Sequence, residues 1–175
     1  MGRLEGKSCV VTGGAGSIGS ATARLFLSEG AGVFLVDRDV EALQAVAAQL
    51  GERDRLAWAA ADVSNAAETA AYVERAVQAF GPIDILFSNA GNFGVVRPIA
   101  DYPDDVFEAV MAVHVKGAYL AAKHVVPHMR DGGAVVITSS VAAMRGDAGV
   151  YAYIIAKHAQ VGLMRCLAKE LARRR

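Results

Sequence analysis

The sequence predicts an α/β fold of three layers, in which helices cover both faces of a doubly wound parallel sheet. Five short apolar runs alternate with longer segments of helical periodicity. The runs are almost continuously apolar, as parallel strands are when both of their faces are buried. Right-handed crossovers then place helices on both sides of the sheet. The length of 175 residues suits a single domain over 1–175.

The elements follow one another in a regular order along the chain. The expected strands are 8–12, 32–37, 55–60, 83–89 and 133–139. The expected helices are 17–29, near 40–50, near 65–80, near 104–129 and from about 150. Gly30, Gly51 and Gly81 each follow a helical segment, where a left-handed C-cap would lie. This order of strand, helix and strand is typical of parallel sheets.

Composition and charge exclude several classes of protein. The 18 basic residues balance the 18 acidic ones, so no nucleic-acid-binding surface is expected. Cys9 and Cys166 lack metal or redox spacing, which indicates reduced thiols in a cytoplasmic protein. No apolar run approaches the length of a membrane span, and a soluble protein is expected. His124 and His128 lack a carboxylate or cysteine partner, so no metal site is predicted.

The first strand is followed by a glycine-rich turn, "TGGAGSIG" (12–19), which opens a helix. Its glycines match G-x-G-x-x-G, where glycine lets the backbone approach a pyrophosphate and the free helical N–H groups favour negative charge. Such turns also serve packing, but the position after the first strand favours a Rossmann-like dinucleotide site. The residues expected to bind the cofactor here are Gly13, Gly14, Gly16, Ser17, Ile18 and Gly19.

The second strand ends at Asp37, eighteen residues beyond Gly19. At this spacing a carboxylate can accept hydrogen bonds from the adenosine ribose hydroxyls, and its charge would repel a 2′-phosphate. NAD is therefore favoured over NADP, although Arg38 beside it could accommodate a phosphate. The alternative is that Asp37 only caps the helix that starts near Asp39.

Several further motifs, in order, resemble the short-chain dehydrogenase/reductase family over essentially the whole chain. They are "RLEGKSCVVTGGAGSIG" (3–19), "ADV" (61–63), "SNAG" (88–91), "ITSS" (137–140) and the pair Tyr153 and Lys157. The resemblance implies that Asp62 and Val63 hold the adenine edge. It also implies that Asn89, Ala90 and Gly91 support the cofactor ribose.

Ser140 is followed thirteen residues later by Tyr153, and four residues later by Lys157, which resembles the family's Ser, Tyr-x-x-x-Lys arrangement. Residues four apart share a helix face, so the lysine ammonium could stabilise a phenolate whose pKa is otherwise near 10. Tyr153 would then act as general base for hydride transfer between NAD(H) and a secondary alcohol or ketone, with Ser140 donating to the substrate oxygen. The resemblance adds that the lysine grips the nicotinamide ribose. Taken alone, such a pair is more often solvated on a helix surface.

The sequence departs from the family pattern in two places. His114 in "VHVKG" stands at the position of an asparagine that, in the family, helps hold a water linking the lysine to solvent. An imidazole could relay protons there, or could be a packed helix residue without a role. The chain also ends at "LAKELARRR" (167–175), before the family's last strands and substrate loop. A fragment is favoured over a reduced relative, and the fifth strand is expected to form an exposed apolar edge.

Partners and alternatives complete the sequence-based expectations. Because the family commonly pairs the helices at 104–129 and 151–172 across subunits, a homodimer or homotetramer is expected. The first alternative function is a catalytically silent NAD-binding or regulatory protein. The second is a nucleotide-sugar epimerase or dehydratase, since the turn also fits T-G-x-x-G-x-x-G.

Overall fold

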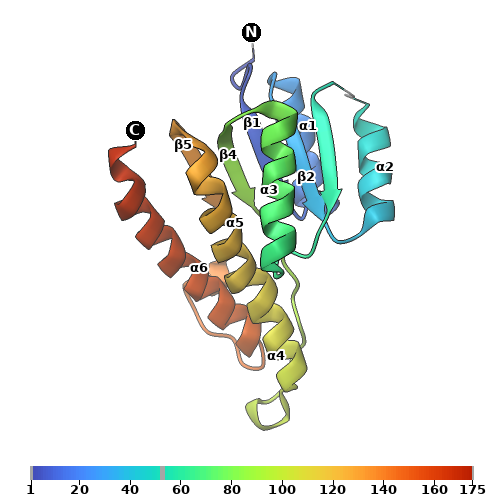
Figure 1. Ribbon diagram of the computed structural model, residues 1–175. Coiled ribbons are helices and arrows are strands. Elements are labelled where there is room, and N and C mark those ends of the chain that lie inside the picture. Colours follow the sequence, from blue (N-terminus) through green and yellow to red (C-terminus); the bar gives the residue numbers. More distant parts are fainter. Residues whose placement is uncertain (1, 52–53, 175) are drawn as a thin grey trace.

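The computed structural model describes residues 2–51 and 54–174, which form a five-stranded parallel sheet covered by helices (Figure 1). The strand order is β3-β2-β1-β4-β5. The strands are β1 (Ser8–Thr12), β2 (Gly32–Asp37), β3 (Leu56–Ala60), β4 (Ile83–Ser88) and β5 (Met129–Ile137). The predicted three-layer parallel fold is confirmed.

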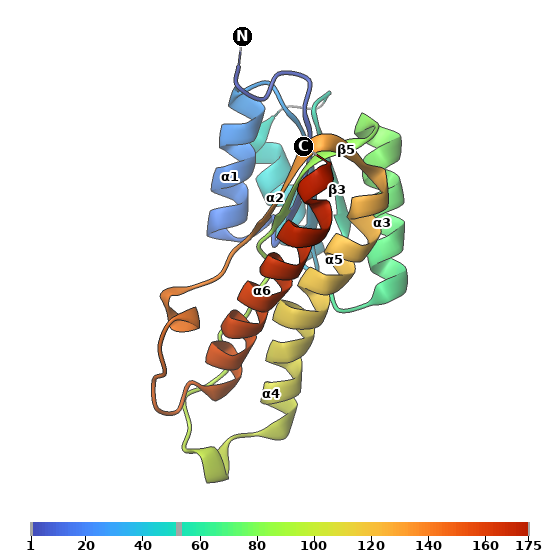
Figure 2. The ribbon, with the colours of Figure 1, turned by 90° about the vertical axis from the view of Figure 1, so that its left-hand side faces the viewer.

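Helices lie on both faces of the sheet, with α1 and α2 on one face and α3, α5 and α6 on the other (Figure 2). Their bounds are α1 (Ser17–Ser28), α2 (Val40–Leu50), α3 (Ala66–Phe80), α4 (Asp104–Met111), α5 (Gly117–Val125) and α6 (Tyr151–Glu170). Alternate strand residues serve the two faces: Val10 and Phe34 join the core under α3 and α5, whereas Cys9 and Leu35 join the core under α1 and α2. Within the described residues, no helix is long and apolar enough to cross a bilayer.

The ends of the helices follow local chemistry. The side chain of Asp39 caps α2 by accepting from the Ala42 N–H, and Asn65 caps α3. Gly51 ends α2 in the left-handed conformation, as predicted. Gly30 follows the end of α1 with a φ of 93°, and the N–H groups of Gly30 and Ala31 donate to the carbonyls of Leu27 and Phe26, so this glycine end is also confirmed. Gly81 has a φ of 76° but a ψ of -160°, so it is not in the left-handed helical conformation.

The prediction of one uninterrupted α-helix near 104–129 is wrong. It is divided by a π-helical turn (Ala112–Lys116) between α4 and α5, and a 3-10 turn (Val126–His128) follows α5. Pro127 lies in that 3-10 turn, where it cannot donate to a continuing helix. The expected strand 133–139 begins earlier, at Met129, and ends at Ile137.

The topology places one crevice and one open edge. After β1 the chain crosses over to β2 on one side, and after β4 it crosses over to β5 on the other side. The carboxyl ends of β1 and β4 therefore border the topological switch point, the crevice where ligands bind in such sheets. At the other end of the order, β5 pairs only with β4 among the described strands. Val136 on this strand is 48% exposed, so the expected exposed apolar edge is present.

Candidate active site

The glycine turn after β1 is shaped so that side chains do not fit. Gly13 has a φ of +65°, and a Cβ there would lie 2.9 Å from the Ala90 Cα. A Cβ on Gly19 would collide with the Gly13 carbonyl oxygen. Among the described residues, no side chain caps α1 at Gly16. The first N–H groups of α1, at Ser17 and Ile18, are therefore left for an anionic ligand.

Asp37 at the end of β2 is tied to this turn. Its Oδ2 accepts from the Ala15 N–H at 3.1 Å, and its Oδ1 accepts from the Asp39 N–H at 3.3 Å. Asp39, not Asp37, provides the cap of α2. The carboxylate thus stands beside the turn that would cradle a pyrophosphate.

A cavity of about 140 Å³ lies next to Asp37 and collects most of the residues predicted to hold the adenosine half of a cofactor. It is lined by Gly13, Asp37, Arg38, Ala61, Asp62, Val63, Ala90, Gly91, Asn92 and Val113. The pKa of Asp62 is lowered because its carboxylate accepts from the Ser64 N–H and hydroxyl, with Arg38 and Lys116 adding positive charge nearby. The residues that line this cavity suit the adenosine half of a dinucleotide, because carboxylates and backbone groups there can pair with ribose hydroxyls and an adenine edge.

A chain of hydrogen bonds joins this cradle to the centre of the sheet. The buried Thr12 hydroxyl accepts from the Asn89 and Ala90 N–H groups, at 3.0 and 3.2 Å. The Asn89 amide donates to the Gly13 carbonyl at 3.4 Å and accepts from the Thr138 hydroxyl at 3.0 Å. The ends of β1, β4 and β5 are held together by side chains as well as by the ladder.

Lys157 and Tyr153 face each other at the carboxyl edge of the sheet. The Lys157 Nζ lies 5.3 Å from the centroid of the Tyr153 ring and donates to the Thr138 carbonyl at 2.7 Å. Lys157 is 3% exposed, and burial lowers the pKa of its ammonium to about 8. Tyr151, by contrast, packs edge-on against Tyr102 at 5.8 Å. The arrangement suits a phenol that exchanges protons next to a buried cation.

Ser140 follows β5 rather than ending it. Its side chain accepts from the Ala142 N–H at 3.1 Å and thereby caps a short 3-10 turn (Val141–Ala143). Ser139 beside it donates to the Lys157 carbonyl at 3.3 Å. In this position the Ser140 hydroxyl proton is free to be given to another acceptor.

The comparisons with known proteins identify the family. The model of the short chain dehydrogenase family matches residues 7–175. The chain belongs to the short-chain dehydrogenase family. The short chain aldehyde dehydrogenase 1 of Euphorbia lathyris is 38% identical over 174 residues, covering 97% of this chain and 60% of that relative. The chain thus spans well under two thirds of the length of this curated relative of the family.

Solved structures of short-chain dehydrogenases superpose closely. An NAD+-bound xylitol dehydrogenase has a TM-score of 0.94 at 35% identity, covering 98% of this chain and 67% of that chain. A short chain dehydrogenase from Burkholderia cenocepacia, in complex with NADP, has a TM-score of 0.92 at 34% identity, covering 98% and 71%. The predicted family and fold are confirmed.

His114, which stands at the position of the family's asparagine, contacts the segment after β4 and the Tyr153 ring. It is buried in the π-helical turn, where its Nε2 lies 2.7 Å from the Asn92 carbonyl oxygen and 3.1 Å from the Asn92 nitrogen. Its ring meets that of Tyr153 edge-on, with 5.5 Å between centroids. Burial lowers the pKa of His114, the hydrogen bond to the Asn92 backbone opposes this, and the nearby Lys157 ammonium adds a smaller lowering effect. Among the described residues, the imidazole lies beside Tyr153 and makes no hydrogen bond to Lys157.

Sequence reasoning missed three polar residues of this site. Thr12 and Thr138 connect the strand ends, and Gln160 donates from its Nε2 to the His114 carbonyl at 3.1 Å. Gln160 lies three residues after Lys157 and seven after Tyr153, on the same helix face. A polar side chain at this spacing was the only feature of the sequence that could have indicated a role for Gln160 in the site.

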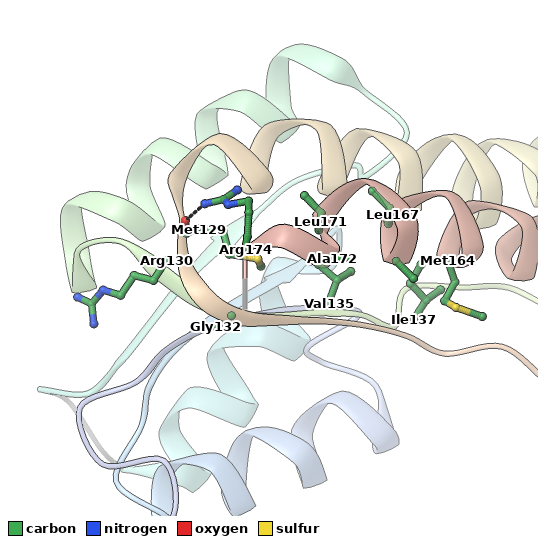
Figure 3. Close-up of a pocket in the computed structure, with 12 residues that line it drawn as sticks. Met129, Arg130, Gly132, Val135, Ile137, Met164, Leu167, Leu171, Ala172 and Arg174 are labelled. Carbon is green, nitrogen blue, oxygen red and sulfur yellow. Dashed lines mark hydrogen bonds between the residues drawn. The ribbon is translucent and has the colours of Figure 1, made fainter.

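A larger cavity, of about 470 Å³, lies away from these residues (Figure 3). It lies between β5 and the second half of α6 with the 3-10 turn that follows, and side chains such as Val135, Leu167 and Leu171 line it. Arg174 closes one end by donating to the Met129 carbonyl. Because none of the predicted catalytic or cofactor residues lines it, the cavity belongs to the open edge of the sheet rather than to the site.

Proposed function

We propose that this chain carries the cofactor site and catalytic residues of an oxidoreductase that interconverts a secondary alcohol and a ketone. The observation that carries the proposal is the buried Lys157 ammonium beside the Tyr153 ring, at the same sheet edge as the glycine turn. The structure of the xylitol dehydrogenase holds NAD+ and that of the Burkholderia cenocepacia short chain dehydrogenase holds NADP, which supports a nicotinamide cofactor. Asp37, whose charge would repel a 2′-phosphate, favours NAD over NADP.

The residues divide the chemistry between them. A bound nicotinamide would accept or give the hydride. In the oxidation direction Tyr153, as phenolate, takes the hydroxyl proton of the alcohol, and in reduction it returns a proton to the forming alkoxide. The Lys157 ammonium stabilises the phenolate, and the Ser140 hydroxyl donates to the substrate oxygen. The glycine turn and α1 hold the pyrophosphate through backbone N–H groups.

The test is the replacement Tyr153→Phe, followed at the NADH absorbance band with a panel of secondary alcohols. Because general acid–base catalysis contributes about 10²–10⁴-fold, kcat should fall by about that factor while NADH affinity, measured by calorimetry, stays within about twofold. Tyr151→Phe is the matched control, since that ring packs on Tyr102. Full activity of Tyr153→Phe would refute the mechanism. The ratio of kcat/KM for NAD and NADP in the same assay tests the cofactor preference.

The second candidate is a catalytically silent dinucleotide-binding protein. The cavity beside Asp37 and the start of α1, which has no side-chain cap, support this candidate as well as they support the first. Both features would bind a cofactor without any contribution from Tyr153. It predicts NADH binding without turnover and equal NADH affinity in Tyr153→Phe.

The proposed assembly is a homodimer or homotetramer through α4, α5 and α6. Exposed large apolar side chains on α5 and α6 support it, with Tyr119 50%, Ile155 45% and Met164 43% exposed. Sedimentation equilibrium measures the assembly directly, and a monomer at all concentrations would contradict it.

A further inference from the structure

The π-helical turn that carries His114 is held to α6 by one buried amide. Gln160 is 3% exposed, and its Nε2 donates to the His114 carbonyl at 3.1 Å. A carbonyl oxygen has two lone pairs, so the His114 carbonyl can accept this bond from outside its own helix in addition to a bond within it. Gln160 lies on the same face of α6 as Tyr153 and Lys157. The turn and the catalytic face of α6 are therefore joined next to the site.

The imidazole of His114 reaches the segment that follows β4. Its Nε2 lies closer to the Asn92 oxygen, at 2.7 Å, than to the Asn92 nitrogen, at 3.1 Å. Its Nδ1 is buried without a partner among the described residues. If the proton sits on Nε2, that nitrogen donates to the Asn92 carbonyl along the shorter contact, and Nδ1 is left as an unpaired acceptor. The N–H of Asn92, an exposed residue, then loses Nε2 as its acceptor. Any form with a proton on Nδ1 leaves a buried donor unpaired, which is generally the rarer defect.

The ring also fits tightly between two other parts of the site. A Cβ on Gly91 would collide with the His114 Cε1, so only glycine admits the imidazole at this place. On its other side Tyr153 lies between the rings of His114 and Phe93, at centroid distances of 5.5 and 5.1 Å. One side chain thus touches both the cofactor-side segment at 91–92 and the proposed general base.

We propose that His114, as the neutral Nε2–H tautomer, and Gln160 are a pair of positioning residues. Gln160 fixes the π turn on α6, and His114 fixes the Asn92 peptide and one side of the Tyr153 ring. The proposal rests on the proposed function, because positioning matters only if Tyr153 transfers protons. It gives His114 a role other than the proton relay expected from the sequence.

The surroundings of the ring favour its neutral form. The charged and titratable groups that act on it are the Lys157 ammonium and the Tyr153 phenol, both on α6. The segment at 91–92 offers peptide groups. A second proton on His114 would add charge beside Lys157 and bury an N–H without an acceptor, so both effects oppose protonation.

Nitrogen NMR of the four histidines tests the tautomer without any need for turnover. In the unmodified protein at pH 7, His114 should show one protonated and one unprotonated ring nitrogen, with the proton on Nε2. The exposed His128 and His158 provide internal comparison. Protonation of Nδ1, or averaging of the two nitrogen signals, would overturn the proposal.

The kinetic test replaces the amide by a side chain of similar length, in Gln160→Met. We expect kcat to fall about tenfold while KM for NAD changes by less than about twofold, because misplacement of catalytic groups acts on the chemical step. The His114 nitrogen signals should also begin to average. The control is Gln78→Met on the exposed surface of α3, which should leave both unchanged. Unchanged kcat with an unchanged His114 tautomer in Gln160→Met would overturn the pairing.

Different results would contradict the proposed function and the positioning role of His114 and Gln160. If the unmodified protein neither binds NADH nor oxidises any alcohol, the proposed function fails, and the nitrogen spectra still decide whether His114 and Gln160 are coupled. If the unmodified protein turns over and Gln160→Met does so equally well, only the positioning role fails. Urea unfolding of each variant, measured in parallel, separates loss of kcat from loss of folded protein.

Discussion

Replacing Lys157 by methionine is expected to stabilise the domain at neutral pH while removing its proposed activity. The ammonium is 3% exposed, and burial lowers its pKa from about 10.5 to about 8. Since one pKa unit corresponds to about 1.4 kcal/mol, keeping the buried group charged costs about 3 kcal/mol. Methionine lacks this cost but leaves the Thr138 carbonyl without its donor, a loss of about 1–2 kcal/mol. The net gain at pH 7 is about 1–2 kcal/mol.

The stability advantage of Lys157→Met should decrease as the pH rises. Below pH 8 the lysine is protonated in both the folded and the unfolded chain, so the full cost is present. Between pH 8 and about 10.5 the unfolded chain holds a proton that the folded chain has released, and the unfolding free energy of the unmodified protein rises with pH. Above that range both states are neutral. The advantage of Lys157→Met should therefore shrink by about 3 kcal/mol and reverse.

Urea unfolding at several pH values between 7 and 10.5 measures the difference between the two proteins. Groups that titrate in both, such as the buried Cys9 thiol with its pKa raised to about 12, cancel in that difference when they lie apart from the substitution. A variant that is less stable at pH 7, or a difference that does not change with pH, would refute the reasoning. In parallel, turnover of Lys157→Met should fall by about 10²-fold or more, in line with loss of the cation that stabilises the phenolate.

Two further predictions concern the cradle and the base of the sheet. Gly19→Ala places a methyl group against the Gly13 carbonyl oxygen, so NADH affinity measured by calorimetry should fall at least about tenfold; Gly162→Ala, which meets open space, is the control and should leave NADH affinity unchanged. Asp84→Ala removes the carboxylate that accepts from the buried Ser8 N–H at 2.9 Å, so urea unfolding should show a loss of about 1–3 kcal/mol. Unchanged NADH affinity in the first, or unchanged stability in the second, would contradict these expectations.

The parts of the fold that the sequence predicted well are those set by local pattern. The first four strands and the first three helices lie within one residue of the expected bounds, because apolar runs and helix-ending glycines such as Gly51 mark them directly. The π turn around His114 was not predicted, since periodicity over 104–129 does not reveal an inserted residue in a helix. The early start of β5 was missed because "MRDGG" (129–133) is polar and rich in glycine, as edge segments are.

The same distinction holds for the candidate site. The spacing of Tyr153 and Lys157 fits a surface helix equally well, and Ser140, thirteen residues before Tyr153, was the signal that singled them out. The glycine turn could be recognised because it directly follows β1. Thr138 reaches Asn89 from 49 positions away, and Gln160 reaches His114 from 46 positions away. A hydrogen bond between such distant segments leaves no pattern in the sequence, so these roles became visible only in the structure.

Side chains that belong to the proposed site also hold α6 to the rest of the domain. Two hydrogen bonds that hold its first half to the body, from Lys157 to the Thr138 carbonyl and from Gln160 to the His114 carbonyl, come from side chains on the catalytic face. Loss of activity in a Gln160 variant could therefore arise from loosened packing as well as from lost positioning. Urea unfolding must therefore accompany the kinetics of the Gln160 variant. Lys157→Met does not have this ambiguity, because it should raise stability and lower turnover together at pH 7. An inactive but more stable variant cannot owe its inactivity to unfolding, and it would assign the loss to the charge itself.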